Sequence, residues 1–115
     1  MICHVTVRTP KLDESVAFYQ WLLDLSISSR ISYPDVEIVF MGEHETKLEF
    51  IKDNNAKSIN AEGLTVGFLV DSLEDKLAML KEKGIEHSAI VSPGPNTRFA
   101  FFTDLNGCSI QLMQR

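Results

Sequence analysis

Hydrophobic and polar positions repeat along this chain in the same order twice. Residues 2–8 alternate between the two kinds of side chain, as a strand with one buried face does. Residues 12–25 then carry apolar side chains at intervals of three to four, which indicates an amphipathic helix. Three more strand-like segments follow, and residues 64–114 run through the same order again. The pattern therefore predicts two strand–helix–strand–strand–strand (βαβββ) units in one α+β chain.

The boundaries of these elements follow from the turn residues between them. The first unit is predicted to contain a strand over 2–8, a helix over 12–25, and strands over 27–33, 36–41 and 46–52. The second is predicted to contain a strand over 64–70, a helix over 73–83, and strands over 86–91, 98–103 and 108–114. Residues 92–96 (SPGPN) and 104–107 (DLNG) are read as a rigid loop and a tight hairpin turn.

The second helix carries the clearest end signals. Ser72 is a candidate N-cap with Asp75 three residues later, and Gly84 is placed to end the helix. We expect Phe99 and Phe101, two aromatic residues of the strand over 98–103, to pack against this helix as core.

Length and composition limit the possibilities further. The chain has 115 residues, 44% of them hydrophobic, which suits one globular domain. We divide it into a first module over 1–52, a polar linker over 53–62 and a second module over 63–115. A net charge of −5 without any basic cluster argues against nucleic acid as a partner, and no apolar run is long enough to span a membrane. With no signal peptide visible, we expect a cytoplasmic protein.

The two cysteines do not indicate a metal or redox motif. Cys3 and Cys108 stand alone in strand-like segments, without a CxxC pair or regular Cys/His spacing. We expect both thiols to be reduced and partly buried.

The repeat places different chemistry at matching positions of its two copies. His4 and Glu49 lie 45 residues apart in the first copy, and Thr65 and Gln111 lie 46 apart in the second. Alternation turns His4 away from the Val5/Val7 side of its strand. A doubled unit of this kind favours a site at the pseudo-symmetry axis, to which each copy contributes.

Several short segments, in order, resemble the vicinal oxygen chelate superfamily. This family includes glyoxalase I, bleomycin-resistance proteins, fosfomycin-resistance proteins and extradiol dioxygenases. The matching segments are His4–Val7 with Ser15–Tyr19, then Lys47–Ile51, Phe68–Asp71 and Phe102–Leu112. The resemblance covers the whole chain and implies two βαβββ modules that form a cupped sheet around a small molecule.

The resemblance also implies a metal-ligand set. Metal-using members take one ligand from the first strand and one from the last strand of each unit, here His4, Glu49, Thr65 and Gln111. Thr65 stands where many members have a second His, and Gln111 stands where most have Glu. His4, Glu49 and Gln111 would then hold a divalent ion such as Zn, Ni, Mn or Fe(II), and Glu49 would also move the proton of a lyase or isomerase reaction.

A second interpretation stays open because two of the four ligand positions are altered. In that case the metal has been lost, and His4 and Glu49 form a polar pair on the floor of a cleft that binds or sequesters a ligand without catalysis. With a single His at a ligand position, extradiol dioxygenase chemistry is disfavoured.

Other residues are candidates for contact with the ligand or with a second chain. Arg98 would hold an anionic group if it shares the cleft with Phe102, and Tyr33 and Thr65 would line the same pocket. His44 and His87 are expected on the surface. We expect a homodimer, since each half-sheet leaves one face for another unit to cover.

Overall fold

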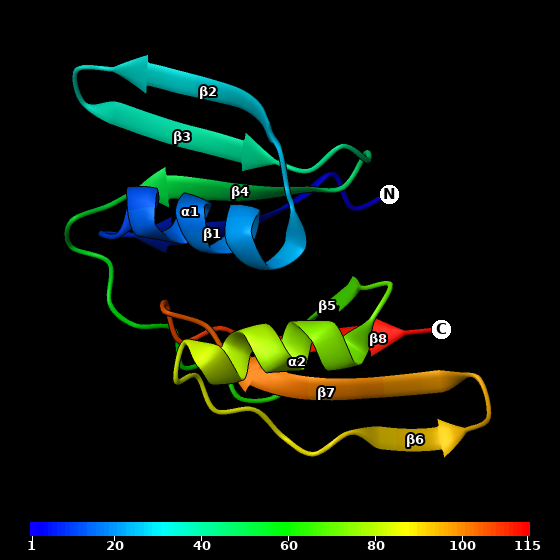
Figure 1. Cartoon of the computed structure of the whole chain (residues 1–115). Coiled ribbons are helices and arrows are strands. Elements are labelled where there is room, and N and C mark those ends of the chain that lie inside the picture. Colours follow the sequence, from blue (N-terminus) through cyan, green and yellow to red (C-terminus); the bar gives the residue numbers. More distant parts are fainter. The chain divides into compact units, whose positions relative to one another are not determined.

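The computed structural model describes all residues from 1 to 115, and it contains two compact units, Met1–Ser58 and Ile59–Arg115. Each unit has the order βαβββ, as Figure 1 shows. The predicted α+β fold of two such modules is confirmed. No helix is both long enough and apolar enough to cross a membrane.

Except for the sixth strand, the element boundaries agree with the predicted ones to within two residues. The first unit contains β1 (His4–Thr9), α1 (Leu12–Leu23), β2 (Ile27–Tyr33), β3 (Val36–Met41) and β4 (Lys47–Lys52). The second contains β5 (Val66–Leu69), α2 (Leu73–Glu82), β6 (Val91–Gly94), β7 (Thr97–Thr103) and β8 (Ser109–Gln114).

Both sheets have the same topology. The strand orders are β1-β4-β3-β2 and β5-β8-β7-β6, each a sheet of four strands. The first strand of each unit pairs in parallel with the last, and the remaining pairs are antiparallel. The long connection that a parallel pair needs is made by the helix and the two strands between the first and last strands of the unit.

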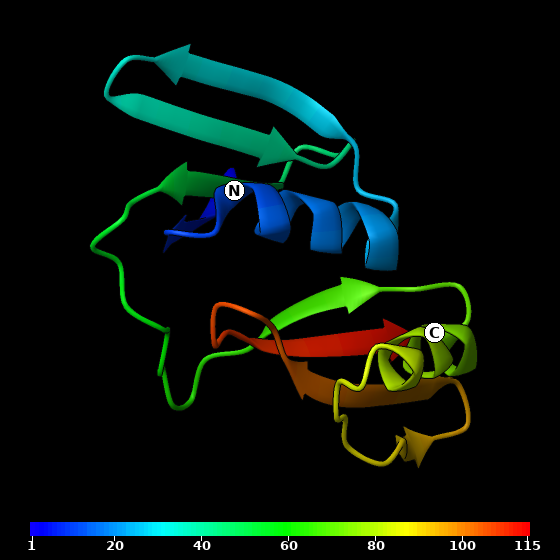
Figure 2. The ribbon, with the colours of Figure 1, turned by 60° about the vertical axis from the view of Figure 1, so that its left-hand side comes forward.

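One helix covers one face of each sheet, as Figure 2 shows for α1 and α2 separately. In the first unit, Tyr19 of α1 stacks on Phe50 of β4 with ring centroids 5.7 Å apart. Both side chains are fully buried, together with Leu22 and Val39. Burial of this apolar stripe, at roughly 1.5–3 kcal/mol per large side chain, is what holds α1 to the sheet.

The second unit builds an equivalent core. Leu73 and Leu80 of α2 are fully buried, and so are Ala100 and Leu112 of the sheet beneath. The N-terminus of α2 is tied down twice: Ser72 Oγ accepts a hydrogen bond from the Asp75 amide, and Gln114 Oε1 accepts one from the Leu73 amide. The predicted N-cap thus forms.

The expected orientation of β7 is wrong. Ala100 and Phe102 are the buried residues on the α2 side, whereas Phe99 and Phe101 are half-buried on the opposite side. Their rings contact each other edge to face, with centroids 5.6 Å apart. Every position from 99 to 102 is apolar, so alternation alone does not say which pair faces the helix.

The sixth strand also differs from its predicted position. A strand was expected over 86–91 and a loop over 92–96, but β6 occupies Val91–Gly94 and contains Pro93. Proline is tolerated there because β6 is an edge strand whose outer N–H groups need no partner. Earlier in this segment, an isolated bridge between His87 and Phe102 and hydrogen bonds between Ser88 and Phe101 join the chain to β7.

The chain after α2 turns in a left-handed conformation. Gly84 has φ +72°, and its amide donates to the Lys81 carbonyl. A side chain at position 84 would meet no atom within 4 Å, so only the backbone conformation requires glycine here.

We therefore predict that Gly84→Ala lowers the free energy of unfolding by about 1 kcal/mol, the cost of a left-handed non-glycine residue. Gly94→Ala is the matched control, because position 94 also has open space around it but no positive φ. Denaturant unfolding of the two variants should show a loss for the first and little change for the second. Equal midpoints would contradict this account.

The two cysteines lie in different surroundings. We expected both thiols to be partly buried, but Cys3 is exposed. Cys108 is half-buried, and burial, followed by the nearby Asp104 carboxylate, raises the pKa of its thiol.

Cys3 should accordingly react with iodoacetamide faster than Cys108 near pH 8, by about tenfold, since the thiolate is the reacting species. Peptide mass spectrometry over a time course measures both rates in one sample. Faster labelling of Cys108 in folded protein would show that its surroundings do not protect it; the two rates should converge in urea.

Candidate functional site

Each sheet has an open face, which we define as the face that its own helix does not cover. Strand register assigns residues to it, because directly paired residues point to the same side of a sheet. In the first unit, Thr6 pairs with Glu49 and Glu49 pairs with Phe40, so these three side chains form one row across the open face. His4 lies two residues before Thr6 on the same side of β1.

A polar cluster occupies this row. The His4 Nε2 and Glu49 Oε1 atoms lie 3.5 Å apart, and Thr6 Oγ1 donates a short hydrogen bond to the same Oε1. The structure thus brings together the two candidate residues His4 and Glu49, and adds Thr6, which the sequence analysis did not single out. Because both contacts fall on Oε1, the second oxygen of Glu49 is left for another partner.

Burial makes this cluster chemically significant. The Glu49 side chain is only 10% exposed, whereas the His4 side chain is 41% exposed. A buried carboxylate is costly unless it is hydrogen-bonded, and Thr6 supplies that bond. The edge of the His4 ring also contacts Phe40, with centroids 5.8 Å apart, which restricts where the imidazole points.

The open face of the second unit carries the other two candidates. Thr65 and Ser109 share a hydrogen bond of 3.0 Å between their hydroxyl groups. Gln111 pairs with Gly67 on one side and with Phe101 on the other. A Cβ atom placed on Gly67 would lie 3.0 Å from Gln111 Oε1, so the carboxamide lies over the glycine.

The two rows correspond position by position. Thr6, Glu49 and Phe40 in the first unit match Gly67, Gln111 and Phe101 in the second, by the same strand pairings. Where the first unit has a hydroxyl and a carboxylate, the second has a glycine and a neutral amide. The copies therefore keep the geometry of the row and differ in its charge.

Two further candidates lie elsewhere. Arg98 and Phe102 are on the α2 side of β7, where Phe102 is buried and Arg98 forms an ion pair with Glu74 of the helix. The hydrogen bond from Arg98 lowers the pKa of the Glu74 carboxyl and raises that of the guanidinium. We expected Arg98 and Phe102 to share the cleft. They do share one side of β7, but it is the side that α2 covers.

Tyr33, the remaining candidate, lies at the end of β2. It pairs with Val36, and its side chain is 68% exposed. Its strand is an edge of the sheet, three strands away from His4.

The donor groups fit a divalent ion only in part. Zn–N and Zn–O bonds are about 2.0–2.2 Å long, so two ligands of one ion can lie 3.5 Å apart as His4 and Glu49 do. However, no group of three His, Cys, Asp or Glu side chains is present. A third donor would have to be neutral, and Gln111, the one that the resemblance offers, belongs to the other unit.

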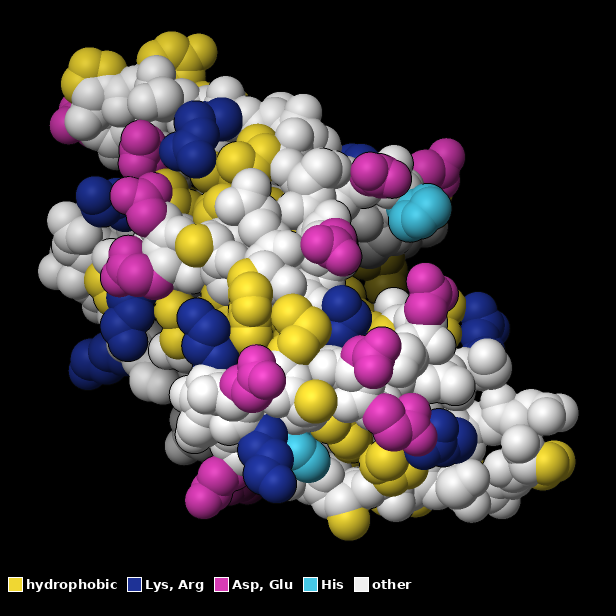
Figure 3. Space-filling model, viewed as in Figure 1, with side chains coloured by type: hydrophobic (Ala, Val, Ile, Leu, Met, Phe, Trp, Pro, Cys, Tyr) yellow, Lys and Arg dark blue, Asp and Glu magenta, His cyan; other side chains and the backbone are white.

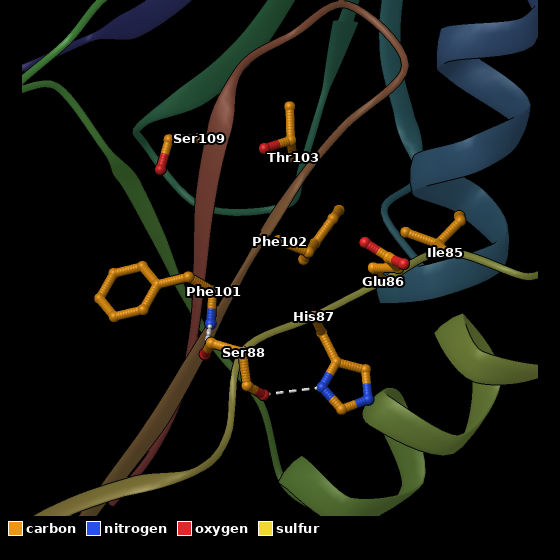
Figure 4. A pocket seen from close by; sticks show the side chains of 8 residues that line it. All are labelled: Ile85, Glu86, His87, Ser88, Phe101, Phe102, Thr103 and Ser109. Atoms are coloured by element: carbon orange, nitrogen blue, oxygen red, sulfur yellow. Dashed lines mark hydrogen bonds between the residues drawn. The ribbon is translucent and has the colours of Figure 1, made fainter.

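A hollow of about 520 Å³ lies on the second unit and was not predicted (Figure 4). Phe101, Thr103 and Ser109 line it from the sheet, and His87 and Ser88 line it from the segment after α2. Ser88 Oγ accepts the Phe101 amide, which holds this segment beside β7. The sequence of residues 86–88 has no motif that would have indicated a pocket wall.

Comparisons with known proteins agree with this architecture. The structure of a glyoxalase family protein from Enterococcus faecalis matches with a TM-score of 0.76 and 22% identity, covering 99% of this chain and 97% of the other. A trypanothione-dependent glyoxalase I from Leishmania major matches with a TM-score of 0.82 and 21% identity, covering 99% and 86%. A fosfomycin resistance protein, FosX, from Listeria monocytogenes, solved with Mn(II) and sulfate, matches with 0.79 and 15%, covering 100% and 92%.

At these identities the structural matches establish the fold and not an activity. A comparison with curated proteins found no match. The family model described as "Glyoxalase/Bleomycin resistance protein/Dioxygenase superfamily" matches residues 1–112. With the family model covering nearly the whole chain and the fold agreeing throughout, this chain belongs to the glyoxalase/bleomycin resistance protein/dioxygenase superfamily.

Proposed function

We propose that the chain binds a small, oxygen-rich organic molecule on the open faces of its sheets, with the His4–Glu49 pair as the main polar anchor. The observation that carries the proposal is the buried Glu49 carboxylate, which takes Thr6 and His4 on a single oxygen. A buried carboxylate must be paired with other groups, and one that keeps an oxygen without a protein partner can accept a hydrogen bond from a ligand.

The geometry supports specific roles for the two side chains. Glu49 Oε2 is positioned to accept a hydroxyl proton from a ligand, because Thr6 and His4 already hold Oε1 in place. The half-exposed His4 imidazole can donate to a ligand oxygen or accept from one. Phe40, next in the row, offers an apolar surface for the carbon skeleton.

A metal-dependent lyase or isomerase is the second candidate, and the spacing of His4 and Glu49 favours it. A divalent ion, when bound, would polarise a ligand oxygen. His4 would supply its only nitrogen ligand and Glu49 its only carboxylate. Gln111, the third donor that the resemblance implies, would contribute no charge.

Neutralising Glu49 tests the main proposal. We predict that Glu49→Gln weakens binding of vicinal diols and α-hydroxycarbonyl compounds by about tenfold or more, since hydrogen bonds to a charged acceptor contribute roughly 1.5–3 kcal/mol. NMR titration of the full chain measures this, with Thr6, Phe40 and Glu49 amides as reporters. Glu45→Gln, a change in an exposed turn, is the control. Equal loss in both variants, or no binding by the unaltered chain, would contradict the proposal.

Metal content separates the two candidates. If the chain holds an ion, protein purified without chelators should contain stoichiometric Zn, Ni, Mn or Fe, and His4→Ala should remove it because no other imidazole is available. Gln111→Glu should retain more metal by adding a charged ligand. Elemental analysis by mass spectrometry measures the moles of metal per mole of chain in each protein. Stoichiometric metal that survives in His4→Ala would refute the ligand assignment.

We further propose that a second copy of the chain covers exposed apolar surface. Hydrophobic side chains stand out at the end of the β2–β3 hairpin, at the upper left of Figure 3. Ile31, Tyr33 and Val36 of this hairpin are all exposed. Exposed apolar clusters of this kind mark association surfaces more often than they remain in solvent.

Sedimentation at micromolar concentration should therefore show a dimer of the 13.0 kDa chain. Tyr33→Ser combined with Val36→Ser should raise its dissociation constant by about tenfold or more, since buried aromatic residues dominate interface energies. Ile2→Ser, which alters an exposed side chain near the N-terminus, is the control. A monomer at all concentrations would refute the dimer.

A further inference from the structure

The open face of the second unit has an ordered gradient of polarity along its strands. Register divides it into three rows, each running across the sheet. The first row contains the hydroxyl groups of Thr65, Ser109 and Thr103. The second row contains Gly67, Gln111 and Phe101, and the third contains Leu69, Met113, Phe99 and Val91.

None of these ten positions carries a charged side chain. The matching rows of the first unit contain His4, Lys47, Glu49 and Arg8. In the strands of the second unit the one charged residue is Arg98, which lies on the α2 side of β7 and pairs with Glu74. Asp71 and Arg115 come after the ends of β5 and β8, and Glu86 borders the hollow from the segment after α2. A charged ligand group over the centre of this face would therefore lose water without gaining a counter-charge, which is costly.

The place where the second and third rows adjoin is suited to a flat ring. Phe101 and Phe99 are half-buried and meet edge to face, so part of each ring remains open to a third. Beside them the Gln111 carboxamide lies over Gly67 and offers both donor and acceptor groups. Glycine matters at this position because the threonine found there in the first unit would occupy the place of the carboxamide.

The surface is also concave where the first row, with its hydroxyl groups, adjoins the second row at Phe101. Phe101, Thr103 and Ser109 line the hollow described above. In Figure 4, the side chains of Phe101 (β7) and Ser109 (β8) lie to the left of the ribbons of their strands, and those of Glu86 and His87 lie to the right. The bridge between His87 and Phe102 agrees, since it places His87 with the residue that faces α2.

We propose that the open face of the second unit binds an uncharged aromatic ring that carries a hydroxyl or amide group. The ring lies against Phe101 and Phe99, its polar substituents pair with the Gln111 carboxamide and the hydroxyl row, and Leu69 and Met113 contact its apolar edge. This inference rests on the proposed binding function and names the class of ligand group that one of the two faces accepts.

Three probes of nearly equal shape test it: neutral 4-hydroxybenzamide, anionic 4-hydroxybenzoate and cationic 4-hydroxybenzylamine. Each is titrated into the full chain while amide resonances of both units are followed by NMR. The neutral probe should shift the amide resonances of Gly67, Gln111 and Met113. It should bind to this face about tenfold more tightly than either charged probe. A charged probe that binds this face as tightly as the neutral one overturns the inference.

Gln111→Glu supplies the sharper test because it adds one charge at the centre of the face. It should weaken binding of the neutral probe and strengthen binding of the cationic probe, each by about fivefold, so that the order of the two affinities reverses. Phe101→Ala should weaken the neutral probe by about fivefold through loss of ring contact. Leu64 is an exposed apolar residue (62%) outside the three rows, so Leu64→Ala should change the affinity of neither the neutral nor the cationic probe.

The outcomes separate this inference from the proposed function. Probe shifts confined to Thr6, Phe40 and Glu49 overturn the inference and leave the first-unit anchor standing. Shifts in the second unit that persist unchanged in both Gln111→Glu and Phe101→Ala also overturn it. Resonance shifts in the second unit that the neutral probe causes and the charged probes do not cause support the inference, whatever Glu49→Gln does. The Glu49→Gln experiment tests only the His4–Glu49 anchor.

Discussion

The constraint on which this structure depends is that each sheet of four strands has a single helix to cover it. A sheet buried on one face must send its apolar side chains there in strict alternation, and the side chains between them must face the other way. Tyr19 on Phe50 illustrates the closed side, and His4 with Glu49 illustrates the open one. The polar groups of the open face are thus positioned by the packing of residues on the opposite face, which the helix covers.

The buried carboxylate is the main support for the proposed binding role of the open face. Glu49 lies between Leu48 and Phe50, whose side chains hold its strand against the helix layer. The carboxylate consequently has little freedom, and Thr6 offsets part of its desolvation. A rigid acceptor with one oxygen already satisfied presents the other in a defined direction, which is the preorganisation that selective binding requires.

Duplication of one unit explains how two chemically different faces share one geometry. The row containing Glu49 and the row containing Gln111 use the same strand pairings, and each is followed by a phenylalanine. Replacing a carboxylate by an amide preserves shape and hydrogen bonding while removing charge. Replacing Thr6 by Gly67 then makes room for the amide over the backbone. Small substitutions in a fixed register are therefore enough to change the charge that each face presents.

The sequence by itself determined the two βαβββ units, their helices and the direction of His4, away from Val5 and Val7, because period and capping are local properties. The family was also recognisable from ordered segments along the chain. Only tertiary structure decided the direction of β7, since residues 99–102 are apolar without alternation. The helix packs on Ala100 and Phe102, which sends Phe101 to the open face and ties Arg98 to Glu74. Which side of an apolar strand is buried depends on the shape of what covers it, and no local pattern records that shape.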